Sequence, residues 1–279
     1  MEYRICFPQI PNMGDLLNKD MLEQLFGISV KADIIGKTGN MLAIGSGLKG
    51  LLYSDEKTTR AKQRLRKIFH FSPFYVWGTG FINYNIGKDK DLIFRDVRFL
   101  SLRGNLTKMR IEKIIKKELD IPTGDGGLLA SLWLGNRPNI KYKTGIIPHF
   151  REKESPIVEE LKKFYNDSVI IDLADKPIDV VRNIASCETI ISSSLHGLII
   201  SDSFHIPNKH VLLYPYGEKM KGDGYKFADY YSSYGLCDTP IEMNNKKLWP
   251  TFSEIQDLYQ IDSDIVEKKK KEIFSVFPK

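Results

Sequence analysis

The chain has 279 residues, of which 42% are hydrophobic and 27% charged, and its formal net charge is +6. This length supports one large or two medium domains with ample core, and the composition is that of a globular protein. No run of about 18 apolar residues is present to span a bilayer, and Glu2 and Arg4 interrupt any secretory signal. We therefore expect a soluble, cytoplasmic protein, bound at most peripherally at the inner face of a membrane.

The positive charge indicates which partners to expect, and the cysteines indicate which kinds of structural site to exclude. A pI near 9 suits an anionic ligand or an acidic surface, although part of the excess lies in Lys268–Lys271, which indicates a solvated helix face. Cys6, Cys187 and Cys237 are far apart and form no C-x-x-C pair. This pattern argues against a disulfide framework or a zinc site. No motif supports binding to nucleic acid.

Strand and helix patterns alternate through the first half of the chain. We expect strands over residues 3–7, 41–44, 74–77 and 97–102, and helices over 14–25, 58–70 and 106–119. The second and third of these strands end in Gly-x-Gly, which lets backbone amides approach a ligand, often an anion. The helix over 58–70 is strongly basic, and an exposed face is favoured over a contact for anionic carriers or lipid.

The second half repeats this alternation. Strands are expected over residues 141–147, 168–172, 188–191 and 210–213, with helices over 154–165, 177–186 and 195–206. The tail over 253–277 predicts an amphipathic helix that packs, with the first domain among the surfaces it could cover. Strands alternating with helices in both halves predict an α/β protein with two doubly wound, Rossmann-like domains, 1–137 and 138–279.

His196 lies where a strand leads into a helix. The apolar run 188–191 precedes three serines, Ser192 to Ser194, and a helical pattern begins at Leu195. Ligands of open α/β sheets bind at this edge, and a helix N-terminus favours anions. The histidine is either a hydrogen-bonded structural residue or a general acid or base, and the sequence leaves both open. Gly197 would let a ligand or a backbone segment come close.

Several motifs occur in the order found in one enzyme family. Ser-x-Leu-His-Gly-x-Ile-x-Ser-x-x-x-x-x-Pro over 193–207 resembles the signature of the polysaccharide pyruvyl transferases. Four further stretches resemble family motifs: Asn12-x-Gly-Asp15, Arg103-Gly-x-x-Thr107, Pro148-His149-Phe150 and Lys226-x-x-Asp229-Tyr230. The stretch from Gly124 to Gly127 matches in part, because the family's proline is missing. Ser194 also departs from the pattern, since many members have arginine directly before Leu-His-Gly.

The resemblance implies a GT-B-like arrangement with the site in the cleft between the domains. It implies transfer of an enolpyruvyl unit from phosphoenolpyruvate onto a sugar of a bacterial surface or exopolysaccharide precursor, forming a pyruvate ketal and releasing phosphate. The acceptor could be lipid-linked or nucleotide-linked. Phosphoenolpyruvate is a co-substrate, and no cofactor or metal is required. His196 is the expected acid, with substrate bound by Arg103, Asn12, Asp15, Ser193, Ser194, Gly197, His149 and Lys226.

These residues have simpler interpretations as well. Arg103 could pair with a neighbouring acid instead of clamping an anion, and Asp15 could simply cap its helix. Amides near Ser193 and Ser194, at the start of the helix, could hold the phosphate by donating hydrogen bonds to it. His149 is predicted to orient the acceptor.

Two other functions stay open at this point. One is a GT-B glycosyltransferase with a nucleotide-sugar donor; the strings Asp89-Lys90-Asp91 and Asp262-Ser263-Asp264 resemble its metal motif but follow no apolar strand. The other is a non-catalytic sugar- or anion-binding homologue that has lost the donor site, which the serine at position 194 keeps open.

Overall fold

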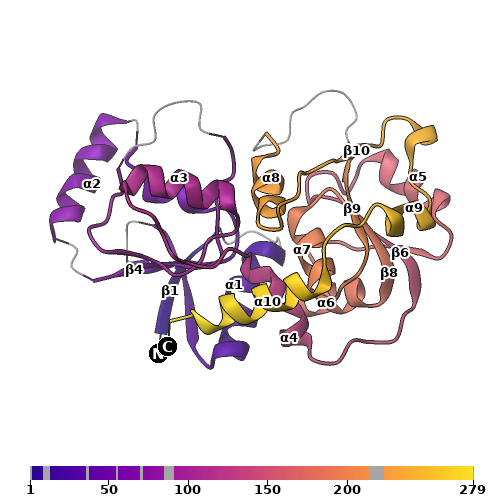
Figure 1. Ribbon diagram of the computed structural model, residues 1–279, viewed down its shortest axis with the longest axis horizontal. Helices are drawn as coiled ribbons and strands as arrows, with labels where there is room; N and C mark the ends of the chain where they lie inside the picture. The colour runs from indigo at the N-terminus through magenta and orange to yellow at the C-terminus, as the bar shows by residue number, and fades with distance from the viewer. Residues whose placement is uncertain are drawn as a thin grey trace.

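A computed structural model of the chain describes residues 2–8, 13–35, 38–54, 56–69, 72–84, 91–213 and 223–278. Two five-stranded sheets lie side by side, with helices around each (Figure 1). Every named pairing in both sheets is parallel, as expected for two Rossmann-like units. Among the described residues, no helix combines the length and apolar character needed to cross a bilayer.

The first sheet has the strand order β2-β1-β3-β4-β5. Its strands are β1 (Glu2–Cys6), β2 (Ser29–Asp33), β3 (Met41–Leu42), β4 (Phe74–Val76) and β5 (Val97–Phe99). The helices of this half are α1 (Met13–Phe26), α2 (Lys57–Phe69), α3 (Asn105–Ile115) and α4 (Ala130–Leu134), with single 3-10 turns at η1 (Leu48–Leu51) and η2 (Gly126–Leu129). The predicted helices and strands are confirmed with shifts of a few residues. No local pattern predicts β2, because this edge strand is mostly polar.

The second sheet has the order β10-β9-β8-β6-β7. Its strands are β6 (Tyr142–Ile147), β7 (Ser168–Ile170), β8 (Cys187–Ser192), β9 (Asn208–Leu212) and β10 (Ile241–Glu242). The helices are α5 (Pro156–Phe164), α6 (Pro177–Ala185), α7 (Leu195–Ser203), α8 (Tyr225–Ser232), α9 (Phe252–Asp257) and α10 (Ser263–Ser275), with a 3-10 turn at η3 (Lys246–Leu248). The predicted boundary at residue 137 lies between α4 and β6.

The two sheets share one topology, which fixes where a ligand is expected. In each sheet the first strand of the half lies between the second and the third, so the chain reverses direction across the sheet there. Open α/β sheets bind ligands at the carboxyl ends of strands beside such a reversal. In the first half this point lies after β1 and β3, and in the second half after β6 and β8. The loop after β6 carries His149, and the loop after β8 leads to His196.

The largest hydrophobic core belongs to both halves. It joins residues of β1 and α1, such as Ile5 and Leu17, to residues of β8 and α7, such as Ile190 and Ile199. Two smaller cores cover the outer faces, one around Phe74 and Ile111 and one around Ile146 and Leu161. The two sheets are therefore joined by continuous apolar packing.

The prediction of a single helix in the C-terminal tail is wrong, whereas the tail does pack on the first half of the chain, one of the surfaces considered for it. It forms two helices, α9 and α10, rather than one, because the chain breaks at Leu258 and Asp262 starts a new helix by accepting hydrogen bonds from the N–H groups of Asp264 and Ile265. Helix α10 returns to the first half, where Trp77 Nε1 donates to the carbonyl of Ile273 at 2.8 Å. The two chain ends consequently lie together (Figure 1).

Candidate active site

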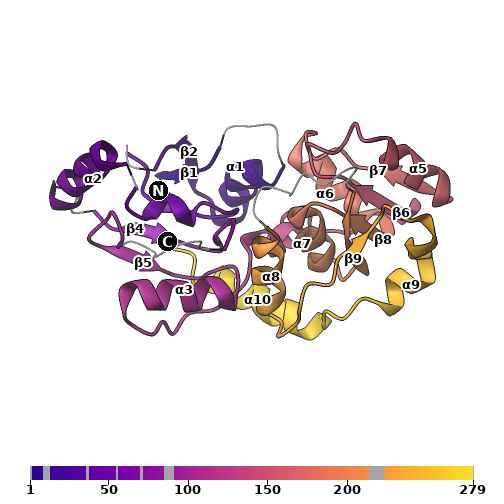
Figure 2. The same cartoon turned by 90° about the horizontal axis from the view of Figure 1, so that it is seen from above.

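His196 lies at the contact between the two halves. It is the second residue of α7, directly beyond the end of β8. Its imidazole packs against Gly14 at the start of α1, so closely that a Cβ added to Gly14 would overlap the ring. Glycine at position 14 is therefore required by close approach. The N-terminal ends of α1 and α7 meet here, near the centre of the molecule (Figure 2).

The environment of His196 favours its neutral form. Burial, and after it the charges of Lys226 and Arg103, lower its pKa to about 3. Its Nε2 atom is buried and has no hydrogen-bond partner among the described residues. An unpaired buried ring nitrogen is costly, so this atom is available to a group that is not part of the described protein.

The serines before α7 form a closed turn. The N–H of Ser193 donates to the carbonyl of Ile147 at 3.1 Å, and the N–H of Ser194 donates to Ser192 Oγ at 3.0 Å. Both of these amides are thus used within the protein, and the prediction that amides near them at the start of α7 hold a phosphate stays a prediction. Gly197 allows α7 to pack on Ser192, which a Cβ would overlap. The close approach at Gly197 is thus to a side chain, whereas the sequence led us to expect a ligand or a backbone segment.

His149, Glu152 and Ser193 form a hydrogen-bonded group at the end of β6. The N–H of His149 donates to Ser193 Oγ at 2.8 Å, and that hydroxyl donates to Glu152 Oε2 at 2.6 Å. Burial, Lys226 and Arg151 lower the pKa of His149 to about 4, whereas burial raises the pKa of Glu152 above its usual value. Sequence reasoning missed Glu152, which follows the Pro148-His149-Phe150 motif after a gap of one residue.

Lys226 supplies a cation beside both histidines. It is the second residue of α8, and its charge lowers the pKa of His196 and of His149. Burial lowers its own pKa to about 8, Arg103 acts in the same direction, and Glu152 and Asp15 oppose the shift. Within the described part of the chain, no hydrogen bond or ion pair is found for the Lys226 ammonium, which lies 5.0 Å from the centroid of the Phe227 ring. Its charge is directed into the region that His196 borders.

Arg103 is engaged entirely by the protein. Its side chain is fully buried, and its Nε lies 2.9 Å from Asp229 Oδ2 in an ion pair that joins the two halves. Nη1 donates to Ser46 Oγ at 2.7 Å, and Nη2 donates to the carbonyl of Phe81. The ion-pair interpretation of Arg103 therefore fits the structure, in which protein groups of the described residues hold the fully buried guanidinium. Its charge still acts on His196 at longer range.

The Arg-Gly-x-x-Thr and Lys-x-x-Asp-Tyr motifs meet at Asp229. The Thr107 N–H donates to Asp229 Oδ1 and the Thr107 hydroxyl to Oδ2, each at 2.7 Å. A Cβ at Gly104 would overlap the Asp229 carbonyl oxygen. Ser232 Oγ accepts from the N–H groups of Asn105 and Leu106. Helix α8 thus supplies the capping groups that the start of α3 requires, and the two motifs fix the position of Lys226.

Asp125 is a second residue that sequence reasoning left without a role. It is fully buried, and its Oδ1 accepts the Gly127 N–H at 2.8 Å, while its Oδ2 has no partner among the described residues. Burial raises its pKa to about 7, against the opposing charge of Arg103. A Cβ placed on Gly127 would lie 3.2 Å from Asp125 Oδ1 and 3.8 Å from His196 Cδ2, so the two side chains flank one glycine. The signal in the sequence was the Gly-Asp-Gly-Gly stretch.

The start of α1 completes the site. Asp15 lies in the first turn of the helix, after its first residue Met13, so it does not occupy the capping position considered for it. Its carboxylate acts electrostatically on Lys226. Asn18 attaches the helix to the end of β3 by exchanging two hydrogen bonds with Ile44, at 2.8 and 3.0 Å. Asn12 lies outside the described residues.

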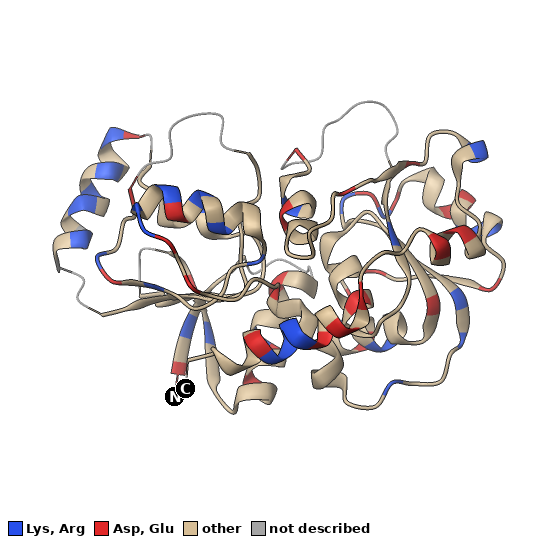
Figure 3. Ribbon diagram, viewed as in Figure 1, with Lys and Arg blue, Asp and Glu red and all other residues tan. Residues whose placement is uncertain are grey.

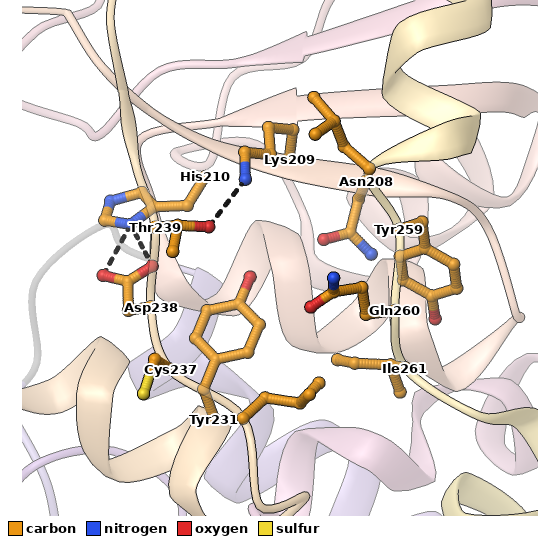
Figure 4. A pocket seen from close by; sticks show the side chains of 12 residues that line it. Asn208, Lys209, His210, Tyr231, Cys237, Asp238, Thr239, Tyr259, Gln260 and Ile261 are labelled. Carbon is orange, nitrogen blue, oxygen red and sulfur yellow. Dashed lines mark hydrogen bonds and ion pairs between the residues drawn. The ribbon is translucent and has the colours of Figure 1, made fainter.

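A separate pocket lies beyond α8, away from His196 (Figure 4). His210 Nδ1 pairs there with both oxygens of Asp238, at 2.9 and 3.0 Å, and Lys209 Nζ donates to Thr239 Oγ1 at 3.0 Å. His210 Nε2 has no partner among the described residues, and none of the predicted site residues lines this pocket. The other face of the His210 ring stacks on Phe227, so the pocket supports the helix that carries the site lysine.

Comparison with known proteins assigns this arrangement to a family. A sequence profile described as polysaccharide pyruvyl transferase matches residues 12–208, which include His196, His149 and Arg103. The chain belongs to the polysaccharide pyruvyl transferase family. An uncharacterized protein of Acanthamoeba polyphaga mimivirus is 30% identical over 282 residues, covering 95% of this chain and 86% of the viral protein.

Membership in the polysaccharide pyruvyl transferase family agrees with the motifs, but the residues of these motifs do not all have the same surroundings in the structure. His196, His149, Lys226 and Asp15 gather around the contact between the halves, together with Glu152 and Asp125. Arg103, Ser194 and Gly197 instead contact the surrounding protein. Ser193 does both, because it hydrogen-bonds Ile147 as well as His149 and Glu152. Lys226 and Asp229 lie beyond the span that the profile matches, although Asp229 pairs with Arg103 inside it and Lys226 acts electrostatically on His196 and His149 inside it.

Proposed function

We propose that the protein transfers a pyruvyl group from phosphoenolpyruvate to a sugar, as the family name suggests. The observation that carries the proposal is the meeting of α1 and α7 at Gly14 and His196, beside the ammonium of Lys226, for which no ion pair is found among the described residues. Two helix N-termini and a half-buried cation favour an anion there. Phosphoenolpyruvate carries a carboxylate and a phosphate, which suit this positive environment.

His196 is the proposed proton donor. In the free protein its pKa near 3 leaves it neutral at pH 7. A bound trianion offsets the charges of Lys226 and Arg103, and the pKa of the imidazole rises because an adjacent negative charge favours the cation. Binding of phosphoenolpyruvate thereby favours the protonated form of His196. Nε2, unpaired and buried among the described residues, is the atom from which the proton leaves.

The proposed reaction balances without a cofactor. His196 gives its proton to the methylene carbon of phosphoenolpyruvate, which becomes a methyl group, and positive charge develops at C2. One sugar hydroxyl adds to C2, and its proton returns to the site. The bond between C2 and the phosphate oxygen breaks, and phosphate leaves. The second hydroxyl then adds to C2, its proton goes to the departing phosphate, and a cyclic ketal remains.

The group around Ser193 suits the acceptor side. Glu152 accepts a hydrogen bond from Ser193, and its pKa is raised by burial. A carboxylate of raised pKa can take a hydroxyl proton at neutral pH. We assign Glu152 this role in the proposal, with His149 orienting the sugar as its neutral imidazole.

Thermal unfolding with phosphoenolpyruvate tests the donor assignment. A ligand at about a hundred times its Kd stabilises by roughly 2.7 kcal/mol, so the wild-type midpoint should rise. Lys226→Gln should lose most of the shift, whereas the matched change of an exposed lysine, Lys163→Gln, should keep it. A shift with UDP and none with phosphoenolpyruvate would assign the protein to nucleotide-sugar chemistry instead, and equal shifts in Lys226→Gln and wild type would remove the lysine from the site.

A further inference from the structure

Helix α2 is attached to the protein by its polar side. Gln63 Oε1 accepts the Ser54 N–H at 2.9 Å, and Arg60 Nε donates to the Ser54 carbonyl at 2.9 Å. Lys67 Nζ lies 2.8 Å from Asp91 Oδ2. The side chains that face the body of the protein are thus hydrogen-bonding groups, where a surface helix usually packs its apolar face.

The opposite side of α2 carries an apolar stripe. Ala61, Leu65 and Ile68 follow each other at intervals of four and three residues and so share one face. The exposed fractions of Leu65 and Ile68 are 58% and 53%. Lys62 and Arg64, both exposed, flank the stripe on its two sides. Helix α2 is therefore amphipathic with its apolar face outward.

The charge of α2 is of a single sign. Its 13 residues include no aspartate or glutamate. Its basic residues are Lys57, Arg60, Lys62, Arg64, Arg66 and Lys67. Figure 3 shows basic residues along the helix, which lies at the end of the molecule farthest from the second sheet.

We propose that α2 docks the protein on an anionic lipid surface. Leu65 and Ile68 would insert at the level of the headgroups, and Lys62 and Arg64 would lie against the lipid phosphates. A basic helix with a narrow apolar face binds membranes in this way, lying in the plane of the interface. Two large apolar side chains and an alanine fall far short of the roughly 800 Å² per partner of a stable protein interface. Charge of one sign also argues against pairing with a second copy of the helix.

Vesicle sedimentation tests this proposal without reference to the transfer reaction. The full-length protein should bind vesicles of mixed phosphatidylglycerol and phosphatidylcholine, should bind vesicles of phosphatidylcholine alone far more weakly, and should be released by added salt. Leu65→Ser with Ile68→Ser removes the apolar stripe, and Lys62→Glu with Arg64→Glu reverses the flanking charge. Each pair should weaken binding by roughly tenfold or more.

Matched variants on the other half of the molecule serve as controls. Leu248→Ser changes a leucine that is 57% exposed, and Lys162→Glu with Lys163→Glu reverses two exposed charges on α5. Both should bind vesicles like the wild type, and circular dichroism should show that every variant is folded. Absence of wild-type binding, or equal loss in the controls, would overturn the proposal. A dimer in sedimentation velocity that the Leu65 and Ile68 changes dissociate would overturn it too, since the stripe would then be a protein contact.

Discussion

At the scale of single residues, the site depends on charges that oppose one another. Lys226 and Arg103 both lower the pKa of His196, while Glu152 and Asp15 support the charge of Lys226. The free protein thus holds an excess of positive potential around a neutral imidazole. Binding of an anion relieves this excess and raises the affinity of His196 for a proton.

Proton uptake on donor binding follows from these shifts. The pKa of free His196 is about 3, so at pH 7 the site gains a proton only if the bound anion raises that pKa above 7. Lys226, with a pKa of about 8, is already mostly protonated and adds about 0.1 proton. Asp125, with a pKa of about 7, can add up to about half a proton in either protein. We therefore expect the wild type to take up nearly one proton more per phosphoenolpyruvate than His196→Asn. Calorimetry at pH 7 in buffers of different ionisation enthalpy measures it; identical uptake in both proteins would contradict the assignment of His196.

At the scale of the elements, α8 decides the geometry of the site. Asp229 and Ser232 cap α3, Phe227 stacks on His210, and Lys226, from the same turn as Phe227, acts electrostatically on His196. The Arg-Gly-x-x-Thr motif of the first half therefore contributes by seating a helix of the second half. A change in the contact between α3 and α8 would therefore displace Lys226 without altering any group proposed to contact phosphoenolpyruvate.

Gly104→Ala tests the contact between the start of α3 and α8. A Cβ at this position would overlap the backbone carbonyl of Asp229, and a buried overlap of this kind lowers the free energy of unfolding by about 1–3 kcal/mol. Donor binding should weaken as well, because Lys226 moves with α8. Gly124→Ala is the matched control, since its nearest contact is the side chain of Ile273 at 3.2 Å, which can adjust. Urea unfolding of the two variants measures the difference; equal stability would mean that α8 is not seated as described.

The sequence predicted most elements and few of the contacts between them. Apolar runs and helix periodicity located β1, β6, β8 and α7, because those signals are local. The edge strands β2 and β10 were not predicted, because they are short or polar. The break before α10 was not predicted either, although aspartate at position 262 is a residue type that favours the N-cap of a helix. The motif of Arg103 was found, yet its partner Asp229 is 126 residues away, and no local pattern specifies such a pairing.

At the scale of the whole molecule, the two halves are joined by both apolar and ionic contacts. The central core includes residues of both sheets, α10 crosses back to Trp77, and the ion pair of Arg103 with Asp229 lies fully buried between the halves. These contacts predict that the halves unfold together. The arrangement also keeps Gly14 against His196, on which the site depends.

A double-mutant cycle measures the ionic part of this junction. Arg103→Ala leaves Asp229 charged and buried, which should cost about 3–5 kcal/mol of unfolding free energy. Asp229→Ala should cost a similar amount. The double variant should be less destabilised than the sum, because neither charge is left alone. Strict additivity in urea unfolding would contradict a direct pair, and two separate transitions in the wild type would contradict cooperative unfolding.

The measurement that tests the central claim most directly is release of phosphate from phosphoenolpyruvate across a panel of sugar acceptors. The wild type should release phosphate with at least one acceptor, and His196→Asn should be slower by about 10²–10⁴-fold, the usual contribution of a general acid. His205→Asn changes a more exposed histidine, paired with Glu267, and should retain the wild-type rate. Full activity of His196→Asn, or turnover of a nucleotide sugar in place of phosphoenolpyruvate, would contradict the account.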